Sequence, residues 1–94
     1  MSVNIYLKGR LYLKLENKSN AILEFNRSIK SENDYLDYRA KSAYELTKLY
    51  HKNKDETNAS FYYKLCFNLN DGLNKNLENK LKRNFDNTTK VETN

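Results

Sequence analysis

The sequence YELTKLY at residues 44–50 is a second copy of YLKGRLY at residues 6–12. The two copies begin at Tyr6 and Tyr44, which are 38 residues apart. The same separation relates further pairs of similar residues: Arg10 and Lys48, Leu11 and Leu49, Tyr12 and Tyr50, Lys14 and Lys52, Ala21 and Ala59, Phe25 and Tyr63, Ser28 and Cys66, and Ile29 and Phe67. A fixed period of this size is typical of helical repeat proteins.

Apolar residues recur at helical spacing through five segments that polar breaks separate. The chain contains no Pro and two Gly, so the two strongest helix breakers are nearly absent. We therefore expect an all-α fold. The expected helices cover residues 3–16, 19–30, 35–52, 56–70 and 72–86. Their first turns are expected to be capped by Ser19, by Asn33 or Asp34, and by Asp55, while Asp71 and Gly72 open the last helix.

The five segments are expected to form one domain over residues 1–86. Two helix–turn–helix hairpins occupy about residues 2–33 and 35–71, and a C-terminal capping helix occupies about residues 72–86. Each hairpin alone leaves an apolar face open to water; stacking closes these faces and the last helix covers the end. Residues 87–94 are mostly polar, and we expect a flexible tail there.

Within each copy, small residues stand where the two helices of a hairpin would cross, and large residues fill the space around the crossing. They are Gly9, Tyr12, Ala21, Phe25 and Ser28 in the first copy, and Ala43, Leu46, Tyr50, Ala59, Tyr63 and Cys66 in the second. Over roughly residues 3–71 the pattern resembles the tetratricopeptide repeat, a helix–turn–helix of about 34 residues. Lys8 and Thr47 depart from the usual Leu and glycine-like residue. The resemblance implies a short right-handed α-solenoid.

In a tetratricopeptide stack the first helix of each repeat lines a concave surface, so the resemblance also implies a groove. The implied groove residues are Tyr6, Arg10, Leu13 and Lys14 from the first repeat, and Lys41, Tyr44, Lys48, His51 and Lys52 from the second. Such proteins mostly bind other proteins, and a cationic groove that contains Tyr suits an acidic protein or peptide segment. The alternative is a solvated Lys-rich face, because the abundance of Asn and Lys indicates AT-rich coding behind the formal charge of +5.

Some members of this family clamp a C-terminal carboxylate with Lys, Asn and Arg from three repeats. Here Tyr6 stands in place of that Lys and Arg10 in place of that Asn, and two repeats are present instead of three. We do not expect this chain to form such a clamp.

The last helix has an apolar stripe with two readings. Its residues are Leu73, Leu77, Leu81 and Phe85. The stripe caps the solenoid, or it docks onto a partner or a second copy, since two repeats and one helix are few for a stable array. The sequence therefore leaves open whether the chain forms a homodimer or part of a larger assembly. The same helix is basic around Lys80–Arg83, so a helical domain that contacts RNA is the alternative function, with nucleic acid as the less favoured partner.

No residue pattern indicates catalysis, and we expect no cofactor or metal. The single His51 has no orienting acid, and the single Cys66 occupies a helix-crossing position where we expect it buried and inert. One cysteine excludes an internal disulfide and a multi-cysteine zinc site. No apolar run approaches ~18 residues, so we expect no membrane span and a soluble protein, with the cytoplasm slightly favoured and a removed leader peptide left open.

Overall fold

The computed structural model of the chain describes residues 4–32 and 35–93, except the side chains of residues 85–93. Within these ranges every regular element is a helix, which confirms the all-α prediction. The helices are α1 (Ile5–Lys14), α2 (Lys18–Lys30), α3 (Leu36–Lys52), α4 (Glu56–Asn70) and α5 (Lys75–Thr93).

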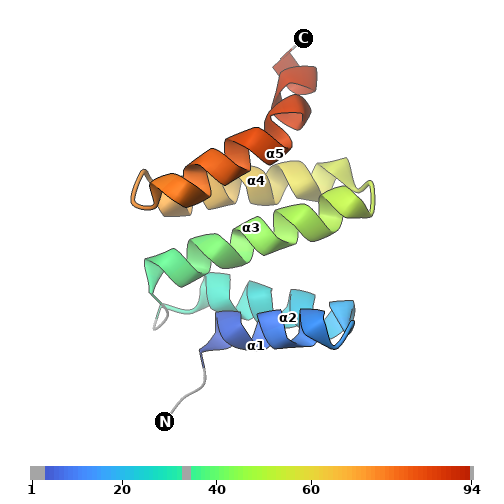
Figure 1. Cartoon of the computed structure of the whole chain (residues 1–94), viewed down its shortest axis with the longest axis vertical. Coiled ribbons are helices and arrows are strands. Elements are labelled where there is room, and N and C mark those ends of the chain that lie inside the picture. Colours follow the sequence, from blue (N-terminus) through green and yellow to red (C-terminus); the bar gives the residue numbers. More distant parts are fainter. Residues whose placement is uncertain (1–3, 33–34, 94) are drawn as a thin grey trace.

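The helices form two antiparallel hairpins and a covering helix (Figure 1). α1 pairs with α2 and α3 with α4; α3 also packs against both helices of the first hairpin, and α5 packs on α4. Side-chain hydrogen bonds join the hairpins: Arg39 donates from Nε to the carbonyl of Ile29 at 2.7 Å, and the Tyr62 hydroxyl donates to Asn26 at 2.8 Å. The α1–α2 hairpin therefore lies at one end of the stack and α5 at the other.

The turn inside each hairpin is the same turn, repeated at the sequence period. Glu16 and Lys54 both have left-handed backbones, with φ of 58° and 63°. The residue after each, Asn17 or Asp55, donates its backbone N–H to a tyrosine carbonyl five residues earlier at 2.9 Å in both turns. A left-handed residue stops helical hydrogen bonding and reverses the chain. The turns of the two copies are thus equivalent in three dimensions as well as in sequence.

The caps of α2 and α4 follow from this shared turn. Asn17 and Asp55 each accept the backbone N–H of the residue three positions on, at 3.2 Å. The predicted cap at Asp55 is confirmed, whereas the predicted cap at Ser19 is wrong, because α2 already begins at Lys18. The cap position of α3 is Tyr35, which makes no side-chain capping bond. The predicted caps at residues 33 and 34 lie outside the described residues.

The connection from α4 to α5 also differs from the prediction. Asp71 and Gly72 have φ of 44° and 76°, so they end α4 and do not open the next helix. Asn74 instead caps α5 by accepting the N–H of Leu77 at 3.0 Å. The helix then continues to Thr93, beyond the predicted end at residue 86.

The two helices of the first hairpin approach closely at Gly9. A Cβ atom on Gly9 would lie 2.5 Å from the ring of Phe25, which is completely buried. In the second repeat the equivalent of Gly9 is Thr47, buried with its hydroxyl donating to a carbonyl of its own helix at 2.8 Å. The aromatic residue equivalent to Phe25, Tyr63, is only half-buried. The larger residue on α3 thus accompanies a less deeply buried ring on α4.

Small residues fill the other crossings, as predicted. Ala21 and Ala59 are 0% and 2% exposed. Cys66 is also fully buried, and its Sγ donates to the carbonyl of Ala40 at 3.2 Å. Burial raises the pKa of the Cys66 thiol to about 12, because a thiolate would lose its hydration there. The prediction that Cys66 is buried is confirmed, and at neutral pH its reactive thiolate form is nearly absent.

Cys66 should therefore be slow to react with thiol reagents in the folded protein. We expect labelling by a maleimide at pH 7–8 to be at least about a hundredfold slower in buffer than in urea, because both access and thiolate formation require opening of the α3–α4 crossing. Mass spectrometry of quenched samples gives both rates. Equal rates in the two conditions would contradict the buried position.

Candidate functional site

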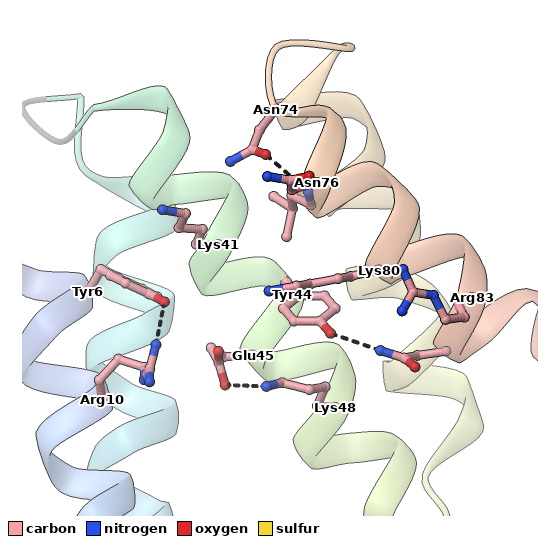
Figure 2. A pocket seen from close by; sticks show the side chains of 12 residues that line it. Tyr6, Arg10, Lys41, Tyr44, Glu45, Lys48, Asn74, Asn76, Lys80 and Arg83 are labelled. Atoms are coloured by element: carbon pink, nitrogen blue, oxygen red, sulfur yellow. Dashed lines mark hydrogen bonds and ion pairs between the residues drawn. The ribbon is translucent and has the colours of Figure 1, made fainter.

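A groove of about 620 Å³ opens between α1, α3 and α5 (Figure 2). Its lining residues are Tyr6 and Arg10 from α1, Lys41, Tyr44, Glu45 and Lys48 from α3, and Asn74, Asn76, Leu77, Lys80, Arg83 and Asn84 from α5. The first helices of the two repeats thus form one side of the groove, and the covering helix forms the other.

The structure brings together five of the residues predicted for a groove. They are Tyr6, Arg10, Lys41, Tyr44 and Lys48. Lys14, His51 and Lys52 lie in the last turns of their helices and do not line it. Leu13 packs against the core, and His51 instead approaches the carboxylate of Glu56, with 3.1 Å between Nδ1 and Oε1. The resemblance implied these helix faces, but the predicted residues in the last turns of α1 and α3 lie beyond the groove.

Two tyrosines form part of the groove wall and hold its polar groups in place. Tyr6 and Tyr44 are 6% and 8% exposed. The Tyr6 hydroxyl accepts a hydrogen bond from Arg10 at 2.9 Å, and the Tyr44 hydroxyl accepts one from Asn84 at 3.0 Å (Figure 2). Tyr6 therefore positions a cation, and Tyr44 joins α3 to α5.

The groove carries a strong excess of positive charge. Five of its side chains are cationic and one, Glu45, is a carboxylate. Glu45 is buried and pairs with Lys48 at 3.1 Å, while the Lys48 ammonium also lies 4.8 Å from the centre of the Tyr44 ring. Among the described side chains, Lys80 and Arg83 form no ion pair with a carboxylate. The groove is thus an anion-attracting surface with one internal counter-charge.

Local contacts raise the pKa of two of these cations. The hydrogen bond to Tyr6 is the main reason that the pKa of Arg10 is raised, and the hydrogen bond to Asp37 raises the pKa of Lys41. Lys41 and Asp37 approach to 3.0 Å at the edge of the groove. Both cations therefore remain charged at neutral pH and above, so they offer a permanent positive potential to a bound anion.

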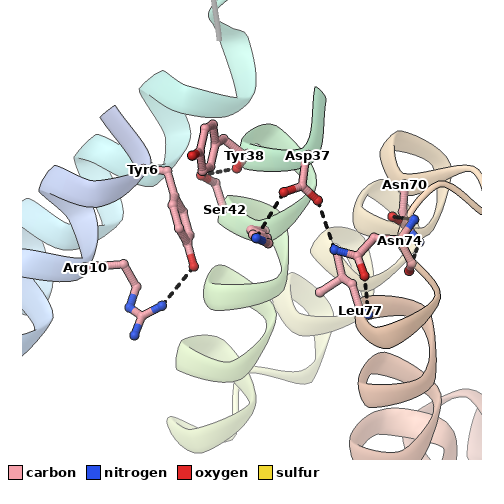
Figure 3. Close-up of polar contacts among 9 residues, drawn as sticks. Tyr6, Arg10, Asp37, Tyr38, Ser42, Asn70, Asn74 and Leu77 are labelled. Atoms are coloured by element: carbon pink, nitrogen blue, oxygen red, sulfur yellow. Dashed lines mark hydrogen bonds and ion pairs between the residues drawn. The ribbon is translucent and has the colours of Figure 1, made fainter. Parts of the chain in front are cut away.

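Asp37 also anchors the start of α5 to α3 (Figure 3). Asn74 donates from Nδ2 to Asp37 at 3.0 Å, while its Oδ1 caps α5. Partial burial alone would raise the pKa of Asp37, but the hydrogen bonds from Asn74 and Lys41 outweigh it and lower the pKa. The carboxylate is thus ionised at neutral pH. One asparagine thereby sets both the first turn of α5 and its attachment beside the groove.

Two residues of the apolar stripe on the last helix are buried against the stack and do not face solvent. Leu77 and Leu81 are 5% and 1% exposed and belong to the hydrophobic core. The prediction of an open interface is therefore wrong for Leu77 and Leu81, because α5 turns these two side chains toward the hairpins. Leu73 lies in the turn before α5 and is 69% exposed. The side chain of Phe85 lies outside the described residues.

The groove residues on α5 were not predicted. Lys80 and Arg83 belong to the basic run that the sequence suggested only as a contact for RNA, not as one side of the groove. A helical pattern separates an apolar from a polar face, but it does not show which neighbour the polar face lies beside. Asn74 offered a weak local signal, because Asn directly before an apolar periodic run is a frequent helix cap.

The described residues contain no group of three or more His, Cys, Asp or Glu side chains that could hold a metal ion. Within the same part of the chain, no helix combines the length and apolar character needed to cross a membrane.

Comparison with known proteins identifies the repeat. The family model described as Tetratricopeptide repeat matches residues 4–35 and 40–72, together more than half of the 94 residues. No curated protein and no solved structure gave a significant match. Tetratricopeptide repeats generally mediate protein–protein interactions, and proteins built from them are typically non-catalytic scaffolds. The first matched segment spans the α1–α2 hairpin, and the second runs from within α3 to just past the end of α4.

Proposed function

Because the chain belongs to the tetratricopeptide repeat family, we propose that it is a non-catalytic interaction module that binds an acidic segment of a partner protein in the groove between α1, α3 and α5. The observation that carries this proposal is the charge of the groove lining, five cations against one carboxylate. Lys and Arg side chains form their strongest hydrogen bonds with carboxylates. A groove of about 620 Å³ also has room for several side chains of a peptide.

The partner segment is expected to carry several acidic residues. A single exposed ion pair contributes less than about 1 kcal/mol, so one carboxylate would not hold a peptide. The cations stand on three helices, Arg10 on α1, Lys48 on α3 and Arg83 on α5, and a segment must cross the groove to meet them all. Arg10 is already held by Tyr6, and Lys48 by Glu45 and the Tyr44 ring. Such preorganisation lowers the entropy lost on binding.

Single-stranded RNA is the second candidate partner, because the cations continue across both hairpins and α5. This arrangement would also suit a chain of phosphates. Proteins that bind single strands combine basic grooves with exposed aromatic rings on which bases stack. Tyr6 and Tyr44 do not offer such platforms, since both are buried and both hydroxyls are hydrogen-bonded within the protein. The groove therefore favours an acidic protein segment.

A charge-reversal pair tests the proposal. We expect Lys80→Glu with Arg83→Glu to weaken binding of a fluorescein-labelled, glutamate- and aspartate-rich peptide by at least about tenfold, because two attractions become repulsions and tenfold corresponds to about 1.4 kcal/mol. The matched control is Lys30→Glu with Lys52→Glu, which makes the same change in net charge at exposed sites outside the groove. Fluorescence anisotropy measures both, and circular dichroism checks that helicity is retained.

The control separates the groove from overall charge. If the two double variants weaken binding equally, the peptide responds to net charge and the groove proposal fails. If the unaltered protein binds a random single-stranded RNA more tightly than the acidic peptide at physiological salt, RNA replaces protein as the preferred partner. Steep loss of affinity with rising salt would accompany that outcome, since each phosphate contact releases counterions.

A further inference from the structure

A second candidate surface lies on α1, which belongs to the hairpin at the end of the stack opposite α5 (Figure 1). Leu7, Leu11 and Leu15 are 53%, 56% and 66% exposed. They are spaced by four residues, so they form one stripe along the helix. This apolar stripe is separate from the groove, which opens toward α3 and α5.

In the second repeat the equivalent helix face is buried. The equivalent of Leu11 is Leu49, which is 9% exposed, and the equivalent of Lys8 is Leu46, which is 0% exposed. These leucines are buried because α3 packs between the first hairpin and α4. At α1 no described helix takes the place of a preceding hairpin. The same kind of helix face is therefore left without its cover.

The charge of α1 restricts what can cover it. Lys8, Arg10 and Lys14 give the helix three cations, and the first carboxylate along the chain is Glu16, beyond the end of α1. A second copy placed with α1 against α1 would bring these cations together. A preceding hairpin like the second repeat would bury Lys8 where Leu46 is buried, and an unpaired buried ammonium is strongly unfavourable.

We propose that this face binds an amphipathic helix of a partner protein, with leucine-type residues toward α1 and acidic residues on its flanks. A shallow hollow of about 300 Å³, lined by Leu7, Arg10, Leu11 and Lys14, can receive one apolar side chain between two cations. Helix-in-groove recognition has this form, with apolar anchors at every third or fourth residue. The acidic residues on the flanks of the partner helix then meet Lys8 and Lys14. A preceding hairpin would leave these two cations without a partner.

The test uses a stapled helical peptide labelled with fluorescein, with Leu at every fourth position and Glu on both flanks. Leu7→Glu with Leu11→Glu is expected to weaken its binding at least about tenfold, because the variant removes the apolar contact and repels the flanks. Leu23→Glu on α2 is the matched control, since Leu23 is equally exposed at 53%. Leu23→Glu should leave binding unchanged, and the groove pair Lys80→Glu with Arg83→Glu should weaken it far less than Leu7→Glu with Leu11→Glu does, which separates this proposal from the groove.

Two further measurements keep the test decisive. The single change Lys8→Glu alters no apolar contact; it should weaken the Glu-flanked peptide and strengthen a Lys-flanked version. Equal binding of the two peptides to the unaltered protein would overturn the proposal. Analytical ultracentrifugation tests whether a second copy of the chain occupies this face. A dimer that dissociates with Leu7→Glu and Leu11→Glu would assign the face to a second copy and would also overturn the proposal.

Discussion

Replacing Phe25 with Ala should lower the free energy of unfolding by about 3–5 kcal/mol. The Phe25 ring is 0% exposed and packs against the backbone of α1 at Gly9. Backbone cannot move into the space as a side chain could, so most of the cavity would remain. A domain of this size is stable by only about 5–14 kcal/mol, and the variant should therefore keep a small margin. Urea denaturation followed by circular dichroism measures the loss.

Two comparisons give this prediction its control. Leu23→Ala on the same helix removes a side chain that is 53% exposed, so it should change stability by no more than about 0.5 kcal/mol. Tyr63→Ala, at the equivalent position of the second repeat, should cost less than Phe25→Ala because Tyr63 is only half-buried. A denaturation midpoint for Phe25→Ala that matches Leu23→Ala would contradict the packing at Gly9.

Replacing Leu81 with Asp should detach α5 from the stack. Leu81 is 1% exposed, so the change loses its burial and also places a carboxylate among apolar side chains. An uncompensated buried charge costs about 3–5 kcal/mol, which adds to the loss of the apolar contacts of Leu81. We expect loss of helical signal for α5, a lower melting temperature, and loss of acidic-peptide binding, because one side of the groove belongs to α5.

Leu73→Asp is the matched control for this second prediction. Leu73 is 69% exposed in the turn before α5, so the same chemical change there should shift stability by no more than about 0.5 kcal/mol. Equal melting temperatures for the two variants would mean that α5 does not depend on Leu81 for its attachment. That result would contradict the claim that α5 forms one side of the groove.

The fold was predictable because its information repeats. The repeat period of 38 residues separates Tyr6 from Tyr44 and Ala21 from Ala59. The same period separates Glu16 from Lys54, the left-handed residues that reverse the chain. A pattern present twice excludes most other pairings of the helices. The faces of α1 and α3 that carry the groove residues were implied by the resemblance to the tetratricopeptide repeat. Cys66 was also placed correctly, since its position matches a small residue at a crossing.

The course of α5 was not predictable in the same way, because α5 has no second copy in the chain. Its apolar stripe showed that Leu77 and Leu81 were candidates for burial, but an open interface fitted the stripe as well. Its attachment depends on Asn74 meeting Asp37, two residues that are far apart in sequence. The contribution of Lys80 and Arg83 to the groove follows from that attachment, and tertiary contacts of this kind leave no periodic trace.

The most direct test of the central claim is a titration of ¹⁵N-labelled protein with the glutamate- and aspartate-rich peptide, followed by NMR. Binding in the groove predicts the largest shifts at amides of Lys41, Lys48 and Arg83, with Leu23 and residues of α4 on its outer face unaffected. In the Lys80→Glu, Arg83→Glu variant the same shifts should require at least about tenfold more peptide. Shifts that are confined to the outer face of α1, or spread evenly over every basic surface, would contradict binding in the groove. The absence of any shift when the peptide is in large excess would also contradict it.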